Sequence, residues 1–129
     1  MNATPDINIP EVLAEVHSAF RQYENALLEN NVKVLNDFFF DAPFTIRYGM
    51  AEHSYGAAEI RAYRKHAAPV DPRRQLNNTI ITTIGHSAAS VCTEFLIPGS
   101  EEVGRQTQCW LRTANGWKII AAHVSALPL

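Results

Sequence analysis

The sequence predicts an α+β fold in which helices come first and the strands of a mostly antiparallel, curved sheet come after them. Up to His66 the apolar residues recur at helical spacing in three segments. From Leu76 onward the composition shifts to β-branched residues, and four strand patterns follow one another across short turns. This order is typical of helices that pack together on one face of a sheet.

The first helix should begin near Asn8, which we expect to be its N-cap because Pro10 and Glu11 follow and both suit a first helical turn. Apolar residues then recur every three or four positions and form one stripe. The stripe consists of Val12, Leu13, Val16, Phe20, Tyr23 and Leu27. Tyr23 is therefore expected to face the core near the far end of the helix, with its hydroxyl as a polar tip.

Two shorter helices should follow, over Val32 to Phe40 and over Ala57 to His66. In the last of these, Ile60 and Tyr63 are expected to face inward. Its basic residues are interpreted as a solvated face, which is the ordinary environment of such a run. These residues are Arg61, Arg64 and Lys65.

Between these helices, Phe44 to Gly49 alternates between apolar and polar residues, which predicts a short strand. Arg47 occupies a polar position of this alternation, so its side chain should point away from its apolar neighbours. Further extended segments are predicted over His53 to Tyr55, Leu76 to Ile84, Ala88 to Ile97 and the two arms of a hairpin over Gly104 to Ser125.

The hairpin should turn at Asn115 and Gly116, because both residues tolerate the positive backbone angles of a two-residue turn. Counting outward then pairs Gln108 with His123. Because side chains alternate across a strand, one face mixes aromatic, amide, imidazole and hydroxyl groups, as a pocket does. This face comprises Gln106, Gln108, Trp110, Ala121, His123 and Ser125.

The opposite face of the hairpin is too apolar to stay open to water as one patch, so we expect a two-fold homodimer through it. It carries Thr107, Cys109, Leu111, Ile120 and Val124. The two cysteines, Cys92 and Cys109, fall in predicted strands without CxxC spacing, which favours reduced, packed thiols over a disulfide.

Length and charge limit the class of protein. With 129 residues, of which 47% are hydrophobic, we expect one domain over residues 1 to 129. The net charge of -2 gives no reason to expect nucleic acid or an anionic membrane as partner. Because no apolar run suits a spanning helix and the polar start does not resemble a signal peptide, a cytoplasmic location is expected.

Five short sequence segments, in the same order and at matching spacing, make the chain similar to one family over nearly its whole length. They are TIRYG at 45 to 49, YGAAEIRAYR at 55 to 64, NNTIITTIG at 77 to 85, GRQTQCW at 104 to 110 and GWKIIAAHVS at 116 to 125. Together they resemble the AtzH-like family, which includes the oxalurate-catabolism proteins called HpxZ. That family belongs to the SnoaL and ketosteroid-isomerase superfamily, so the resemblance implies a cone-shaped fold with a pocket at its open end.

The resemblance also implies an activity. The AtzH-like enzyme of cyanuric acid breakdown is a decarboxylating amidohydrolase that converts 1,3-dicarboxyurea to allophanate. Its chemistry is assigned to a tyrosine of the first helix and to the arginine of the TIRYG-type strand, which correspond to Tyr23 and Arg47 here. From strand parity and the superfamily's geometry, we further expect Gln108, Trp110 and His123 to line the pocket and bind substrate.

These residue types suit a carboxylated urea. A guanidinium grips a carboxylate with two parallel hydrogen bonds, and a phenol beside a fixed cation loses its proton more easily, so it can exchange that proton with nitrogen or water. On the residues alone, Arg47 fits an exposed arginine as well, Tyr23 a core tyrosine, and His123 a hydrogen-bonded pocket histidine.

No cofactor is expected, and no metal site, because the five histidines show neither HxH nor HExxH spacing. Nucleophilic triads find no support either, since GxSxG is absent. Two other functions stay open: an oxalurate or ureide catabolism protein of the HpxZ type, and a non-catalytic association module that only binds small anions.

Overall fold

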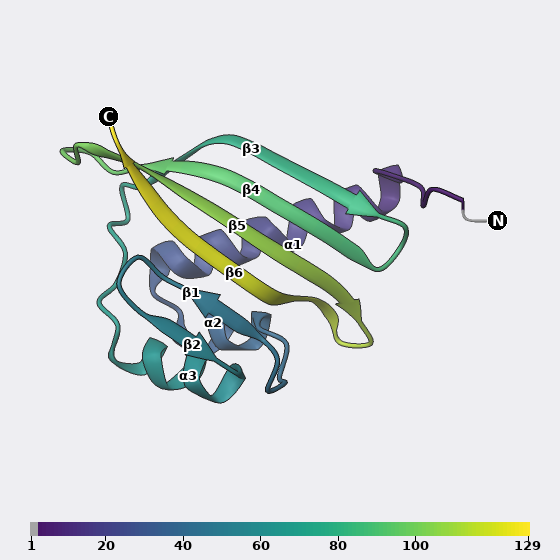
Figure 1. Ribbon diagram of the computed structural model, residues 1–129, viewed down its shortest axis with the longest axis horizontal. Coiled ribbons are helices and arrows are strands. Elements are labelled where there is room, and N and C mark those ends of the chain that lie inside the picture. The colour runs from purple at the N-terminus through teal and green to yellow at the C-terminus, as the bar shows by residue number, and fades with distance from the viewer. Residues whose placement is uncertain (1–2) are drawn as a thin grey trace.

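The computed structural model describes residues 3–129, which form three helices and a six-stranded sheet (Figure 1). The elements are α1 (Pro10–Glu29), α2 (Val32–Phe38), β1 (Ile46–Tyr48), β2 (His53–Tyr55), α3 (Ala57–His66), β3 (Gln75–Ile84), β4 (Ala88–Leu96), β5 (Glu102–Thr113) and β6 (Gly116–Pro128). None of the helices in this part of the chain is long and apolar enough to cross a membrane.

The strands are arranged in the order β2-β1-β6-β5-β4-β3. Strands β3 to β6 form the predicted antiparallel meander, and β1 joins its edge by pairing with β6 in parallel. Helix α1 crosses one face of the sheet, while α2 and α3 gather at the end where β1 and β2 lie (Figure 1). The predicted α+β class, with helices on one face of a curved sheet, is confirmed.

Helix α1 starts without the cap that the sequence suggested. Ile9 precedes the helix and makes no side-chain capping bond. Asn8 instead takes a positive φ of 57° and pairs with β3: its Oδ1 accepts from the Thr83 backbone N–H at 2.8 Å, and its own N–H donates to the Thr83 carbonyl at 3.1 Å. Asn8 therefore attaches the N-terminal segment to the sheet, because its short amide can satisfy a strand edge as readily as a helix end.

The core lies between α1, α2 and the inner face of the sheet. Around the Tyr23 ring, the rings of Phe38, Phe39 and Trp110 stand edge-on with centroids 5.9 to 6.3 Å away. Such T-shaped contacts are the favoured geometry of aromatic pairs. They hold the end of α1, and with it the Tyr23 hydroxyl, in one place.

The hairpin between β5 and β6 turns one residue earlier than predicted. Thr113 pairs with Gly116, which leaves Ala114 and Asn115 as the two loop residues. Gly116 takes the positive φ, at 99°, and the Thr113 hydroxyl donates to its carbonyl at 2.7 Å. The glycine thus follows the turn instead of lying within it, which is a common hairpin geometry.

A bulge at Ile120 changes which residues of β6 face inward. Cys109 pairs with Ala121 but Trp110 pairs with Ile119, so Ile120 is the extra residue. Beyond the bulge Gln108 pairs with Ala122, and the predicted partner His123 pairs with Thr107. The predicted faces are therefore correct for β5 and wrong for the second half of β6, because one inserted residue reverses side-chain direction.

Candidate functional site

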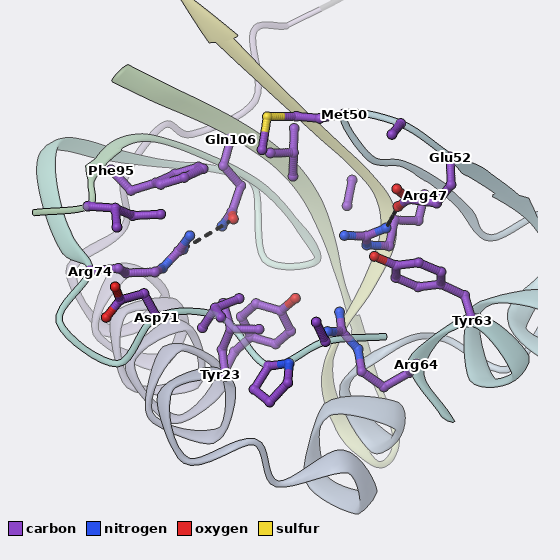
Figure 2. A pocket seen from close by; sticks show the side chains of 18 of the residues that line it. Tyr23, Arg47, Met50, Glu52, Tyr63, Arg64, Asp71, Arg74, Phe95 and Gln106 are labelled. Atoms are coloured by element: carbon purple, nitrogen blue, oxygen red, sulfur yellow. Dashed lines mark hydrogen bonds and ion pairs between the residues drawn. The ribbon is translucent and has the colours of Figure 1, made fainter. Parts of the chain in front are cut away.

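A cavity of about 380 Å³ opens between the end of α1, helix α3, the β1–β2 loop and the inner face of β5 and β6. Figure 2 shows side chains from α1, α3, the β1–β2 loop and β5 pointing into it, and Ala122 and Val124 of β6 complete the lining. Its polar lining comprises Tyr23, Arg47, Glu52, Tyr63, Arg64, Asp71, Arg74, Gln106 and Gln108. Its apolar lining includes Leu27, Met50, Val70, Phe95, Ile97, Ala122 and Val124.

Arg47 enters the cavity because β1 pairs with β6. It lies beside Ala122, an inner residue, while its neighbour Tyr48 lies beside the exposed His123. Its Nη1 donates to the Glu52 carboxylate, and its Cζ lies 4.8 Å from the centroid of the Tyr63 ring. Arg47 is thus held by an ion pair and by a cation–π contact.

Among the arginines that line the cavity in the described part of the chain, Arg64 is the one without a hydrogen-bond or ion-pair partner. It is 7% exposed, and no hydrogen bond or ion pair to it is found among residues 3–129. Its Cζ lies 5.7 Å from the Tyr63 ring, on which the Arg47 guanidinium also rests. The interpretation of Arg64 as part of a solvated face is therefore wrong, since it follows the buried Ile60 by four positions and lies on the same side of α3.

Arg74 is firmly paired. Its guanidinium donates two hydrogen bonds to Glu24, at 2.8 and 2.9 Å, and a longer one of 3.4 Å to Gln106 Oε1. It also lies 4.3 Å from the centroid of the Phe95 ring. Because Gln106 uses its oxygen here, its buried Nε2 is left without an acceptor within residues 3–129.

Tyr23 is 4% exposed and its hydroxyl points into the cavity (Figure 2). Burial raises the pKa of this phenol above its ordinary value of 10.0, because lost hydration disfavours the phenolate more than the arginine charges favour it. Among those charges Arg64 has the largest effect, followed by Arg47 and Arg74. The expectation that a cation makes Tyr23 ionise more easily is therefore wrong in net direction, and the phenol keeps its proton at neutral pH.

Of the three residues predicted to bind substrate, Gln108 lines the cavity and Trp110 and His123 do not. Gln108 lines the cavity and lies beside Ala122, whose other neighbour is Arg47. Trp110 faces inward but is 1% exposed and packed in the core, where its Nε1 donates to Gln108 Oε1 at 3.0 Å. It therefore supports Gln108 and does not line the cavity.

His123 lies on the outer face of the sheet, exposed, with its ring centroid 5.5 Å from that of Tyr48. The expectation that it lines the pocket is wrong, because the bulge at Ile120 turns it away.

The sequence analysis did not predict the charged residues Glu24, Glu52, Arg64 and Arg74 as part of the site. Two of them had a signal in helical spacing: Arg64 as described, and Glu24, which follows the buried Phe20 by four positions and precedes Leu27. Glu52 and Arg74 belong to loops, where no periodicity indicates which side chains turn inward.

The charges of the cavity nearly balance. Glu52 neutralises Arg47 and Glu24 neutralises Arg74. Asp71 at the rim is bound by Arg73, whose hydrogen bonds lower the pKa of Asp71 to about 2, so this pair is also neutral overall. One positive charge, that of Arg64, is left over in the described part of the chain, and the cavity is therefore suited to an anion.

Solved structures share this fold. A cystatin-like fold protein from Burkholderia xenovorans is 43% identical, with a TM-score of 0.94 over 97% of this chain and 98% of that one. A protein of unknown function from Pectobacterium atrosepticum is 47% identical, with a TM-score of 0.92 over 95% of both chains. An NTF2-like protein from Pseudomonas putida, 13% identical, has a TM-score of 0.72 over 89% of this chain and 86% of that one, which confirms the predicted cone-shaped superfamily fold.

A search of curated proteins found no match. Among protein families, the model described as AtzH-like matches residues 5–128.

Proposed function

The chain belongs to the AtzH-like family, and on this basis we propose that it is a cofactor-independent, decarboxylating amidohydrolase that converts 1,3-dicarboxyurea to allophanate. The observation that carries the proposal is a set of unpartnered donors in one cavity. The Arg64 guanidinium, the Tyr23 hydroxyl and Gln106 Nε2 all lack an acceptor in residues 3–129. A buried cation beside neutral donors matches a carboxylate that is attached to a carbonyl or amide group.

The three donors define how such a substrate would lie. Arg64 holds one carboxylate, since it is the only charge in the described cavity that has no counter-ion. Gln106 donates to the urea carbonyl. The second carboxylate then lies toward Arg47, which is the arginine that corresponds to the family's catalytic residue, and the adjoining nitrogen lies within reach of Tyr23.

Tyr23 acts as the acid in this scheme. The bond between the nitrogen and the carboxyl carbon breaks, its electron pair stays on nitrogen, and the protonated phenol supplies the proton that completes the amide of allophanate. The carboxyl carbon leaves as carbon dioxide, or as bicarbonate if water adds first. Arg47 polarises the departing carboxyl group, and the neighbouring positive charges stabilise the phenolate until solvent returns its proton.

Allophanate formation tests the proposal. Dicarboxyurea can be generated in situ by a cyanuric acid hydrolase, and allophanate measured with and without this protein. We expect the protein to accelerate its formation, and Arg64→Gln to raise KM at least about tenfold because the anchoring charge is lost. Equal rates with and without the protein would contradict the proposed reaction.

The charge balance favours a second candidate, a ureide with one carboxylate such as oxalurate. Arg64 alone satisfies such a monoanion, so neither neutral pair needs to open. The same assay with oxalurate separates the two candidates: loss of oxalurate without loss of dicarboxyurea would assign the protein to oxalurate breakdown.

A further inference from the structure

The two ion pairs of the cavity differ in burial and in the number of hydrogen bonds that join them. In the Arg74–Glu24 pair the side chains are 4% and 9% exposed and joined by two hydrogen bonds. In the Arg47–Glu52 pair they are 12% and 27% exposed and joined by one. Glu52 also belongs to the loop between β1 and β2, whereas Glu24 lies within α1. Glu52 is therefore the carboxylate that can leave its arginine at lower cost.

A glycine makes room for Glu52 at Arg47. A Cβ added to Gly49 would overlap the Glu52 carboxylate, so this carboxylate passes directly over the bare backbone of residue 49. The turn is closed by a hydrogen bond of 2.8 Å from the Gly49 N–H to the Glu52 carbonyl. Figure 2 shows the resulting position: Glu52 approaches Arg47 from the loop side, at the edge of the cavity.

We propose that Glu52 is an internal counter-ion that occupies Arg47 while the cavity is empty and gives way when a ligand brings a second carboxylate. This inference rests on the proposed use of the cavity as a carboxylate site. Its consequence is a rule for specificity. A monocarboxylate needs only Arg64, whereas a dicarboxylate must compete with Glu52 for Arg47, so the strength of the Arg47–Glu52 pair sets the preference between ureides with one and two carboxylates.

Two stable probes isolate this preference. Glutarate has the same number of backbone atoms between its carboxylates as dicarboxyurea, and glutaramate differs from it by one amide in place of one carboxylate. Their Kd values are measured by calorimetry for the parental protein, Glu52→Gln and the matched control Glu101→Gln. Glu101 is exposed and outside the cavity lining, so this control makes the same change in net charge.

Glu52→Gln should tighten glutarate binding about tenfold, because Arg47 is freed, and leave the Kd of glutaramate unchanged. Glu101→Gln should change neither. Gly49→Ala should shift binding in the same direction as Glu52→Gln, since a methyl group there displaces the carboxylate without removing its charge.

The outcomes separate the inference from the proposed function. If the parental protein and all variants bind neither probe, the carboxylate cavity itself is contradicted. If the probes bind but the ratio of their Kd values is the same in Glu52→Gln and in the parental protein, the role of Glu52 is contradicted and the cavity's function stands. If Glu52→Gln binds neither glutarate nor glutaramate while the parental protein binds both, Glu52 is a structural support of the cavity and the inference is overturned.

Discussion

At the scale of single residues, the state of the Tyr23 proton decides what chemistry the cavity can perform. Burial raises the pKa of the phenol, and three arginines oppose that effect without cancelling it. A neutral phenol among cations donates a hydrogen bond and a proton but is a poor base. The arginines still matter, because they stabilise the phenolate that proton donation leaves behind.

The pH dependence of turnover follows from this direction. In the proposed reaction the protonated phenol is the reactive form, and burial raises its pKa above 10.0, so kcat should not rise between pH 7 and about pH 10 and should fall only above that range. A steady-state pH profile of kcat measures this. A kcat that instead rises with pH through the neutral range would show that Tyr23 works as a phenolate base.

Part of the cavity could be predicted at this scale and part could not. The resemblance to the AtzH-like family indicated Tyr23 and Arg47, strand parity indicated Gln108, and all three line the cavity. Arg64 was assigned to a solvated face because it belongs to a basic run, although its spacing from Ile60 indicates the buried side of α3. Glu52 is beyond sequence reasoning, because it belongs to the loop between β1 and β2, where no periodicity indicates which side chains turn inward.

At the scale of elements, two features decide where the site residues point. The bulge in β6 turns Ala122 and Val124 into the cavity and His123 out of it. The run around Ile120 is uniformly apolar, so no residue in it marks an insertion. The helices were predictable to within two residues at their ends, because their apolar stripes repeat over whole turns.

Two acidic residues of α1 form ion pairs that differ in burial, so replacing each should lower the free energy of unfolding by a different amount. Glu24→Gln leaves the buried Arg74 without a counter-ion and should lower the free energy of unfolding by about 3 kcal/mol. Glu15→Gln weakens a pair with Arg112 whose side chains are about two fifths exposed, and should cost less than about 1 kcal/mol. Urea denaturation of both variants measures the difference; equal losses would mean that Glu24 is not effectively buried.

At the scale of the whole molecule, the outer face of the sheet lies on the side opposite the cavity and carries exposed apolar residues. Strand pairing places Ile80, Cys92, Thr107, His123 and Tyr48 in one row across five strands. Both cysteines are free and exposed on this face, so the expectation that they are packed is wrong for the single chain. Val124, expected here, lines the cavity instead.

We expect this outer face to pair with a second copy of the chain, because Ile80 is 63% exposed and its neighbours in the row carry little charge. Solution scattering at micromolar concentration should give the mass of a dimer. Cys109→Glu, at the middle of the face, should shift the mass to that of a monomer, whereas Ser18→Glu, exposed on α1, should not. A monomeric parental protein would contradict the prediction.

The proposed reaction requires Tyr23 and Arg47 to act on one substrate in one cavity. The most direct measurement is kcat with dicarboxyurea, together with the Kd of glutaramate, for Tyr23→Phe, Arg47→Lys and the double variant. Tyr23→Phe should lower kcat roughly a hundredfold with little change in Kd, because it removes one oxygen that donates the proton. Arg47→Lys should lower kcat because the planar paired donors are lost although the charge remains.

The double variant decides whether the two residues are coupled. We expect it to lose less activity than the product of the two single losses, since each residue needs the other to act on the same bond. A loss equal to the full product would show independent residues. Turnover by Tyr23→Phe at the parental rate would contradict the proposed reaction and leave a cavity that only binds small anions.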